Sequence, residues 1–306
     1  MKKILWIALT ALWVNCSSPA LAGDAIATSA AQSLPILVYH QIATEGDDSH
    51  FGPVNGPISI SLSKFETQLR YLSDHGFTTL SMDEVVSFLK GKTFPEKIVA
   101  IHFDDGLKSA LKAVPVLNRY GFKATFWIIA GKGIGWPHMD WDEIEALARN
   151  PNFDIFSHTM THPWKDNETL PDWIEGRTPG MGTEQVRWEL TESRRVLEQK
   201  LQRPIPYLAW PAGKYNDKLI RLAQEAGYQA LVTIDRGLNH PGDDPLRIRR
   251  SMVDGSCDHA AFVGILTNEP PAACYYGLPP FMRKVPPEAL PRPGPTDHFL
   301  TLFGRG

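Results

Sequence analysis

Cysteine is scarce in this sequence, with three among 306 residues. Cys16 lies in an N-terminal segment typical of a cleaved export signal, which leaves Cys257 and Cys274 in the mature chain. The mature chain can therefore hold at most one intramolecular disulfide. In an exported protein these two cysteines can pair, or they remain separate thiols if the fold keeps them apart.

An excess of basic residues is also missing. The sequence has 31 lysines and arginines against 34 aspartates and glutamates, a net charge of −3. Removal of the signal takes Lys2 and Lys3 and no acidic residue, which leaves 29 basic against 34 acidic residues and a net charge of −5. This balance does not attract nucleic acid or anionic lipid, so we expect a neutral or cationic partner and no nucleic acid.

The N-terminal apolar run, residues 4–14, is too short to span a bilayer. Lys2 and Lys3 precede it, and Ala20-Leu-Ala22 follows it with small residues at the cleavage positions. This order is typical of an export signal, and we place the cut before Gly23. We therefore expect a periplasmic or secreted protein with no membrane span after cleavage.

A lipoprotein is the alternative at this terminus, because Cys16 follows the apolar run. The residue before it is Asn15, which is larger than the small residue that lipoprotein processing requires, so we favour the cleaved signal. The mature chain then divides into a linker at residues 23–33, a main domain at residues 34–268 and a proline-rich, irregular extension at residues 269–306.

No sequence repeat with a period of about 20–50 residues occurs, which excludes a solenoid. Apolar segments typical of strands instead alternate with amphipathic segments typical of helices. The expected strands are residues 36–40, 77–80, 97–103, 124–129, 152–157, 207–210, 228–234 and 246–250. The expected helices begin at capping boxes at Ser63 and Ser81 and then cover residues 107–120, 140–149, 183–201 and 216–226. This alternation predicts a parallel barrel or a doubly wound sheet.

The sequence Ile101-His-Phe-Asp-Asp-Gly106 ends an apolar, branched run that begins at Lys97. Asp104 and Asp105 therefore follow a buried strand, at the edge where open α/β sheets and barrels bind their ligands. Two adjacent buried carboxylates repel each other unless a cation or a proton neutralises one of them. The pair therefore indicates a metal site.

Two histidines supply further ligands. His158 and His162 follow the expected strand at residues 152–157, four positions apart, and both can reach one cation if the intervening residues turn. With Asp105 they form a set of two imidazoles and one carboxylate that leaves positions open for water, as catalytic metal sites do. Zinc suits this set, and so do cobalt, nickel and iron. A histidine pair alone is a weak indication, but together with Asp104 and Asp105 it is a strong one.

These motifs resemble those of the polysaccharide deacetylases of carbohydrate esterase family 4. Phe103-Asp-Asp-Gly106 and Ser157-His-Thr-Met-Thr-His-Pro163 are similar to the first two motifs of the family. Leu34-Pro-Ile-Leu-Val-Tyr-His40 is similar to the opening strand of the branch that deacetylates poly-N-acetylglucosamine. The resemblance extends over residues 34–262 and implies a distorted, incomplete (β/α) barrel.

The same resemblance implies the role of each residue in the two motifs. Asp105, His158 and His162 hold the metal, and Asp104 stays off it as the general base, within reach of a metal-bound water. This agrees with the chemistry of amide hydrolysis, in which a metal ion activates both the water and the carbonyl group. The simpler alternative for Asp104 is that it only caps the following helix.

Residues 208–213, Leu-Ala-Trp-Pro-Ala-Gly, match the third family motif only in part. Ala209 stands where the family commonly has an arginine that orients the base, and Ala212 stands where it has a tyrosine whose backbone N–H stabilises the oxyanion. Ala212 can keep that role, because a backbone donor does not depend on the side chain. Another residue must orient Asp104. The candidates are Arg247, Arg249 and Arg250, of which we expect at least two to be surface or structural residues.

The general acid is not evident. The family commonly uses a histidine in a short leucine-rich strand near the end of the domain, and the comparable residues 262–268 contain none. His40, which ends the first expected strand on the catalytic edge, is the leading substitute, and His240 and His259 follow. Each of these histidines can equally be structural.

Tryptophans are the candidates for contact with a sugar, because their flat faces pack on pyranose rings. Trp164 and Trp173 lie in the long connection after the second motif, where loops usually carry specificity, and Trp210 lies in the third motif. Trp136 and Trp141 lie in another expected loop, although Trp141 starts a helix and is more simply explained by core packing.

The sequence therefore predicts a metal-dependent N-deacetylase that releases acetate from N-acetylglucosamine units of a polysaccharide and leaves a more cationic polymer. The first alternative keeps the metal and changes the substrate to peptidoglycan, chitin oligomers or another N-acyl or cyclic amide. The second alternative is a carbohydrate-binding pseudoenzyme, which the exchange at Ala209 and the missing late histidine favour. The intact Asp104 and Asp105 oppose it, since a chain without catalysis has no need of a costly carboxylate pair.

Overall fold

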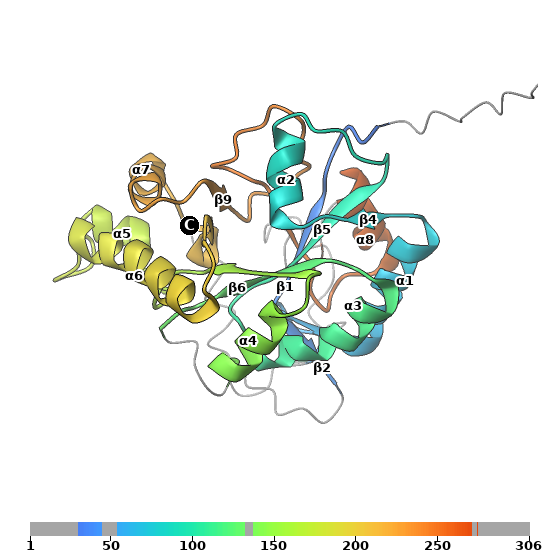
Figure 1. Cartoon of the computed structure of the whole chain (residues 1–306), viewed down its shortest axis with the longest axis horizontal. Coiled ribbons are helices and arrows are strands. Elements are labelled where there is room, and N and C mark those ends of the chain that lie inside the picture. Colours follow the sequence, from blue (N-terminus) through green and yellow to red (C-terminus); the bar gives the residue numbers. More distant parts are fainter. Residues whose placement is uncertain (1–29, 45–53, 132–136, 271–273, 275–306) are drawn as a thin grey trace, which may run out of the picture.

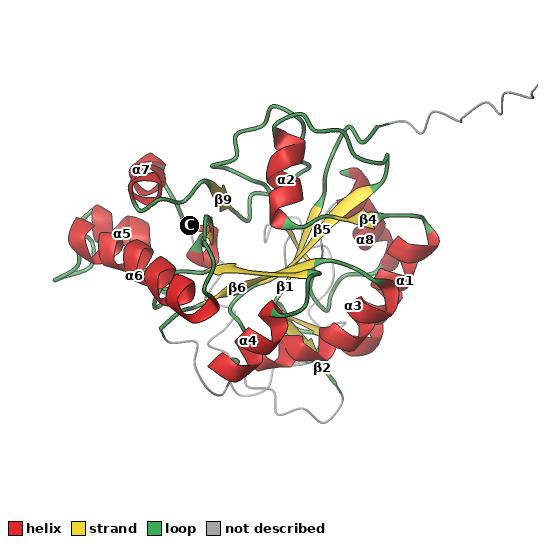
Figure 2. Ribbon diagram, in the orientation of Figure 1, coloured by secondary structure: helices red, strands yellow, loops and turns green. Residues whose placement is uncertain are grey.

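A curled sheet of eight parallel strands forms the centre of the molecule, and helices pack around it (Figure 1, Figure 2). The computed structural model describes residues 30–44, 54–131, 137–270 and 274. The strands follow the order β10-β1-β5-β6-β7-β8-β9, and β4 pairs with β5 beside this path. The predicted export signal and most of the proline-rich extension lie outside the described residues.

The strands are short and largely buried, as expected for a parallel sheet that is covered on both faces. Their bounds are β1 Ile36–Tyr39, β4 Thr78–Thr79, β5 Ile98–Phe103, β6 Ala124–Ile128, β7 Phe153–Ser157, β8 Tyr207–Ala209, β9 Ala230–Val232 and β10 Ser251–Met252. A separate parallel pair, which the sequence analysis missed, consists of β2 Gln41–Ala43 and β3 Ser59–Ser61.

Helices occupy most of the connections between strands. Their bounds are α1 Leu62–Asp74, α2 Met82–Leu89, α3 Val114–Tyr120, α4 Trp141–Ala148, α5 Leu170–Ile174, α6 Thr183–Leu201, α7 Asp217–Glu225 and α8 His259–Thr267, with 3-10 helices at η1 Lys108–Ala113 and η2 Pro211–Gly213. The predicted capping box at Ser81 begins α2, whereas α1 is capped by Ser61 instead of Ser63. None of the described helices has the length and apolar character that crossing a membrane requires.

Residues 248–252 join the two ends of the curled sheet. Ile248 pairs with Val232 at the end of β9, and β10 pairs with β1 in parallel register. The strand predicted at residues 246–250 is therefore wrong in its bounds: Ile248 forms only an isolated bridge, and β10 begins at Ser251, because the segment changes partner within a few residues. The result confirms the predicted distorted, incomplete (β/α) barrel, with Arg250 at the closing segment.

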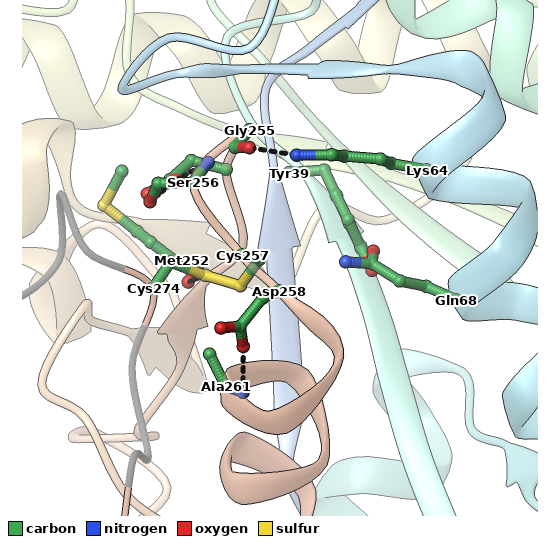
Figure 3. The surroundings of a disulfide bond; sticks show 11 residues. Tyr39, Lys64, Gln68, Met252, Gly255, Ser256, Cys257, Asp258, Ala261 and Cys274 are labelled. Atoms are coloured by element: carbon green, nitrogen blue, oxygen red, sulfur yellow. Dashed lines mark hydrogen bonds between the residues drawn. A yellow bond between two sulfur atoms is a disulfide. The ribbon is translucent and has the colours of Figure 1, made fainter. Parts of the chain in front are cut away.

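Cys257 and Cys274 form a disulfide, with their Cα atoms 4.4 Å apart (Figure 3). The Sγ atom of Cys274 also lies 3.4 Å from the carbonyl oxygen of Met252, in β10. The bond therefore attaches residue 274, part of the predicted extension, to the segment that leads from β10 into α8. Of the two alternatives that the sequence left open, a disulfide or two separate thiols, the structure has the disulfide.

Three expected elements differ in the structure. The helix predicted at residues 107–120 is divided into η1 and α3, and Pro115 lies at the start of α3, where a missing N–H costs nothing. The long connection at residues 163–182 contains α5, which is capped by Thr169. Residues 262–268, compared above with a leucine-rich strand, lie mostly in α8.

Candidate active site

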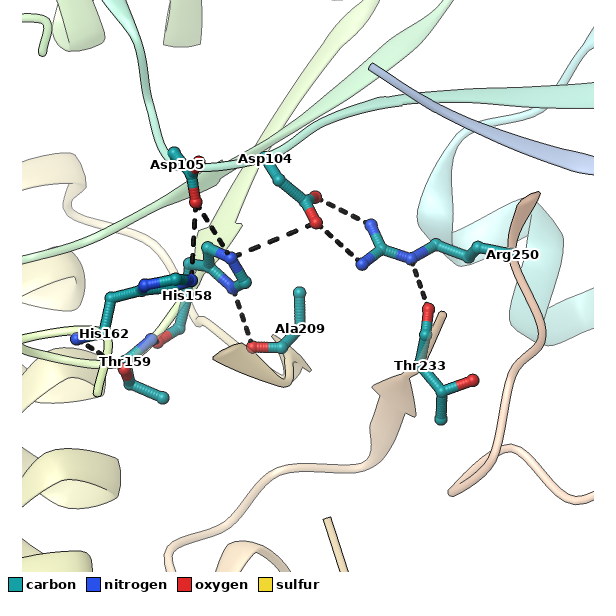
Figure 4. A network of polar contacts seen from close by, with 9 residues as sticks. Asp104, Asp105, His158, Thr159, His162, Ala209, Thr233 and Arg250 are labelled. Atoms are coloured by element: carbon teal, nitrogen blue, oxygen red, sulfur yellow. Dashed lines mark hydrogen bonds and ion pairs between the residues drawn. The ribbon is translucent and has the colours of Figure 1, made fainter. Parts of the chain in front are cut away.

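Asp104 and Asp105 follow β5 and point in different directions (Figure 4). The backbone N–H of Asp104 donates to the carbonyl oxygen of Tyr39 at 2.9 Å, which continues the pairing of β5 with β1. Asp105 and Gly106 then have φ angles of 68° and 66°, so the chain turns sharply at the strand end. This turn directs one carboxylate toward Arg250 and the next one toward the histidines.

Asp105, His158 and His162 form a compact set of possible metal ligands. The Oδ1 atom of Asp105 lies 3.3 Å from Nε2 of His158 and 3.5 Å from Nε2 of His162. One ligand atom from each residue lies within 4.8 Å of the others. Ligands at zinc bond lengths in a tetrahedral arrangement lie roughly 3.3–3.5 Å apart, so the spacing and the donor types both fit a divalent cation.

The ring of His158 is held for this role by the neighbouring strand. Its Nδ1 atom lies 2.9 Å from the carbonyl oxygen of Ala209, at the end of β8. If Nδ1–H donates to that carbonyl, the Nε2 lone pair faces Asp105. A partner on the second ring nitrogen is the usual way in which proteins orient a metal-binding histidine.

A buried carboxylate on α6 fixes the turn between the two histidines. Glu189 is fully buried, and its Oε2 accepts hydrogen bonds from the backbone N–H groups of Met160 and Thr161 at 2.9 and 2.8 Å. The hydroxyl of Thr161 donates to Oε1. Thr159 and His162 have positive φ angles of 66° and 52°, so the turn adopts a backbone conformation that needs such support.

Asp104 is oriented by Arg250. The two guanidinium NH groups donate to Oδ1 and Oδ2 of Asp104 at 2.7 and 2.8 Å, and Nε donates to the carbonyl oxygen of Thr233 at 2.7 Å. Arg250 is fully buried and Asp104 is 3% exposed. A bidentate pair of this kind fixes the plane of the carboxylate. Arg250 therefore supplies the orienting cation that the third motif lacks at Ala209.

The two other candidate arginines are surface residues, as predicted for at least two of the three. Arg247 pairs with Asp244 and Asp217, and Arg249 pairs with Asp243. Both arginine side chains are more than 40% exposed. Neither of these pairs includes Asp104.

The charges of the site suit the binding of a cation. Burial raises the pKa of Asp104, but the charge and hydrogen bonds of Arg250 lower it to about 2. Burial also raises the pKa of Asp105, whereas the hydrogen bond from His158 and the charge of His162 hold it well below its usual range. Burial lowers the pKa of His162 to about 4 against the opposing charge of Asp105. At neutral pH both carboxylates are therefore ionised and His162 is a neutral ligand.

His40 and Ala212 lie at strand ends beside this group. His40 follows β1 and is half-buried, and its charge when protonated lowers the pKa of both Asp104 and Asp105. Ala212 follows β8, three residues after the carbonyl that holds His158, and has φ 49° and ψ 20°. These positions agree with the predicted roles, which stay predictions.

The two lower-ranked histidines contact other parts of the surface. Nδ1 of His240 lies 3.7 Å from Asp243, in the same loop. The ring of His259, at the start of α8, packs edge-on against Tyr71, with ring centroids 5.2 Å apart. Both histidines are exposed, and these contacts favour structural roles.

Burial corrects two of the predicted sugar contacts. Trp210 is fully buried and stacks on Tyr215, so no face is open to a sugar. Trp173 lies in α5 rather than in a loop and is 7% exposed, because it packs in the core. Trp164 is half-buried in the loop after His162 and stays a candidate.

The second predicted tryptophan loop is only partly described. Trp141 begins α4 and packs against the core, which favours core packing over contact with a sugar. Trp136 lies outside the described residues.

Comparison with known families agrees with this geometry. Residues 91–231 match the family model described as polysaccharide deacetylase. Residues 91–231 form a polysaccharide deacetylase domain of carbohydrate esterase family 4. The matched region includes Asp104, Asp105, His158 and His162. The match supports a deacetylase, and thus a hydrolase, as the general activity of this domain.

Curated relatives are similar to this chain at low sequence identity. The putative polysaccharide deacetylase YxkH of Bacillus subtilis is 28% identical over 256 residues, which are 83% of this chain and 78% of the relative. A poly-beta-1,6-N-acetyl-D-glucosamine N-deacetylase of Staphylococcus aureus is 24% identical over 213 residues, which are 66% of this chain and 70% of the relative. These relatives fit the predicted branch of the family.

A solved structure shares the fold. IcaB from Ammonifex degensii superposes with a TM-score of 0.64 at 22% identity, over 77% of this chain and 96% of that chain. This likeness agrees with the (β/α) barrel described above.

Glu189 is a functional residue that was not predicted from the sequence. The signal for it was present, because Glu189 lies on the same helix face as Val186, Leu190 and Leu197, all of which are buried. A charged residue on an apolar helix face needs a buried partner. Here the partners are the two backbone N–H groups of the histidine turn.

Proposed function

We propose that this deacetylase is a metal-dependent enzyme that hydrolyses the N-acetyl groups of an extracellular or cell-envelope polysaccharide rich in N-acetylglucosamine, similar to poly-N-acetylglucosamine. The observation that carries the proposal is the position of Asp104, fixed by Arg250, beside the set of Asp105, His158 and His162. The activity for which the staphylococcal relative is named supports the choice of substrate, and the predicted export signal supports a periplasmic or secreted location.

Asp105, His158 and His162 would hold the metal. Zinc is our first choice, and cobalt, nickel or iron suit the same donors. When bound, the ion supplies a Lewis acid that polarises the amide carbonyl and lowers the pKa of water. A proton shared between His158 and Asp105 must leave first, since the hydrogen bond to Asp105 raises the pKa of His158 against the effect of its burial.

Asp104 is the general base. Its low pKa keeps it ionised at neutral pH, and Arg250 fixes the direction in which its free lone pairs point. Asp104 takes a proton from water as the water oxygen adds to the amide carbon. The backbone N–H of Ala212 donates to the oxygen that becomes negative in this step.

His40 is the general acid. The C–N bond breaks when the amine nitrogen receives a proton, because an amide anion is a poor leaving group. His40 gives that proton from its place at the end of β1 and regains one from solvent. The products are acetate and a glucosamine unit, which is cationic at neutral pH, and Trp164 is the remaining candidate for packing against the sugar.

Acetate release tests this function. The purified mature chain is incubated with β-1,6-linked poly-N-acetylglucosamine, with chelator, and after zinc or cobalt is added back. We expect release that the chelator stops and either metal restores. Acetate release from peptidoglycan or chitin oligomers alone would show that one of these is the substrate instead. Binding of poly-N-acetylglucosamine without any acetate release by the metal-loaded chain would indicate a pseudoenzyme.

A further inference from the structure

His102 is a fully buried histidine that the proposed mechanism does not use. It lies in β5, two residues before Asp104, and is 0% exposed. Among the described residues neither of its ring nitrogens has a hydrogen-bond partner. The same is true of the Thr125 hydroxyl and the Trp127 indole N–H, which lie on the adjacent strand β6 and are also fully buried.

These three side chains lie together on the inner face of the sheet. His102 is in register with Thr125, and its ring lies 5.4 Å from that of Trp127. Phe103, the next residue of β5, packs on Phe65 of α1 and so faces the helices. Because neighbouring residues of a strand point to opposite faces, His102 faces the interior of the barrel.

The cluster adjoins the arginine that orients the base. The guanidinium of Arg250 lies 5.9 Å from the centre of the Trp127 ring. A guanidinium has five N–H donors, and the contacts to Asp104 and Thr233 account for three of those on Arg250. The other two belong to a side chain that, like those of His102 and Thr125, is fully buried.

Polar atoms in such a place need partners. A buried donor or acceptor without a hydrogen bond costs about 1–3 kcal/mol, and buried water with two to four polar neighbours is the usual remedy. Imidazole and hydroxyl groups offer acceptors, whereas guanidinium and indole groups offer only donors. Water can therefore connect the two kinds of group in one network.

We propose that His102, Thr125 and Trp127 enclose ordered water that hydrogen-bonds Arg250, and that His102 is a positioning residue for the Asp104–Arg250 pair. The network holds the guanidinium through the N–H groups that Asp104 and Thr233 do not use. The catalytic part of this proposal rests on the deacetylase function proposed above, and the structural part does not.

The charge state of His102 agrees with this role. Burial and the charge of Arg250 lower the pKa of His102 well below its usual value, and the charge of Asp104 opposes them. A neutral imidazole offers one acceptor and one donor to water. A second cation at this place would repel Arg250 and weaken its hold on Asp104.

A crystal structure of the full mature chain at high resolution tests the network directly. We expect an ordered water at about 2.7–3.2 Å from a ring nitrogen of His102 and from Thr125 or Arg250. A dry cluster, in which no water touches His102, would overturn the proposal. This result does not depend on whether the chain deacetylates any polymer.

Kinetics tests the positioning role. His102→Leu removes both hydrogen-bonding atoms, and we expect kcat to fall about 10–100-fold with KM and zinc affinity unchanged. His102→Gln keeps a donor and an acceptor and should recover most of kcat, while Thr125→Val should lower kcat in the same direction.

The matched control is Phe126→Leu, on the same strand β6 but packed on Phe103 toward the helices. It should lower the free energy of unfolding without the loss in kcat. The positioning role is wrong if His102→Leu loses no more kcat than Phe126→Leu, or if His102→Gln gives no rescue. An inactive wild-type chain would instead count against the proposed function, and the crystal structure would still decide the network.

Discussion

Arg250 donates to both carboxylate oxygens of Asp104 from a position 146 residues later in the chain. The contact forms because residues 248–252 join β9 to β1 and carry the arginine inside the barrel. The closing segment thus supplies the orienting cation for Asp104, and the third motif, with Ala209, does not. The base keeps its orientation although the local motif is incomplete.

This contact predicts the effect of Arg250→Lys. Lysine keeps the charge but cannot form two parallel hydrogen bonds, so the carboxylate loses its fixed plane. We expect kcat for acetate release to fall about 10–100-fold with little change in zinc affinity. Arg249→Lys is the matched control, because Arg249 is exposed and pairs with Asp243, and it should behave like the wild type. Equal activity of both variants would contradict the role of Arg250.

Glu189 predicts a loss of metal affinity at a distance from the metal. Glu189→Leu leaves the backbone N–H groups of Met160 and Thr161 without their acceptor, so the turn that carries His162 loosens. We expect the zinc dissociation constant, measured by calorimetry, to rise about 10–100-fold. Glu189→Gln can still accept and donate here and should keep most of the affinity.

The control for Glu189 lies on the same helix. Glu192 pairs with Arg195 at the surface, and Glu192→Leu should leave zinc affinity unchanged. If Glu189→Leu binds zinc as tightly as the wild type, the turn does not depend on this carboxylate.

His162 predicts how the stability of the metal-free chain depends on pH. The pKa of His162 is about 4 in the folded state and 6.5 when unperturbed, so the unfolded chain takes up a proton between these values while the folded chain does not. The stabilisation present above pH 6.5 is therefore lost as the pH falls, and the loss is complete below about pH 4, at about 3 kcal/mol in total.

Urea unfolding of chelator-treated protein measures this effect. The difference in the free energy of unfolding between the wild type and His162→Gln should shrink between pH 6.5 and pH 4. Parallel pH curves for the two proteins would show that His162 is not held neutral by the fold.

The disulfide predicts a contribution to stability. Cys257 and Cys274 are separated by 17 residues, and closing a loop of this length contributes about 3 kcal/mol. The double substitution to serine should therefore lower the free energy of unfolding by about that amount. Reducing agent should lower the free energy of unfolding of the wild type by a similar amount. An unchanged denaturation midpoint in both experiments would argue against the bond.

The central residues of the site were predictable because their signals are local. Asp104 and Asp105 end one apolar strand and His158 follows another, and parallel strands bring their carboxyl ends to one edge of the sheet. The short sequence segments around these residues therefore show both their residue types and their positions at strand ends. His162 needed only a turn of four residues.

Arg250 was not predictable to the same degree. Three arginines occur within residues 247–250, and their local sequence does not distinguish them. Only the pairing of this segment with β9 and β1 directs Arg250 inward and leaves Arg249 at the surface. Such a register depends on contacts between distant parts of the chain.

The predicted sugar contacts of two tryptophans were wrong for a related reason. Trp173 was placed in an expected loop and Trp210 in the third motif, but Trp173 lies in a short helix and Trp210 directly follows β8 and is fully buried. Both side chains have a large apolar surface, and burying it in the core stabilises the fold more than a solvent-facing position would. The short helix α5 gave too few periodic positions to be recognised in the sequence.

The most direct test of the proposed function compares Asp104→Asn with the wild type in two measurements on the same samples: bound zinc per chain and acetate release from β-1,6-linked poly-N-acetylglucosamine. We expect the variant to keep its zinc, because Asp104 is not a ligand, and to release no measurable acetate, because the base is gone. Acetate release by the variant at the wild-type rate would contradict the assignment of Asp104 as the base.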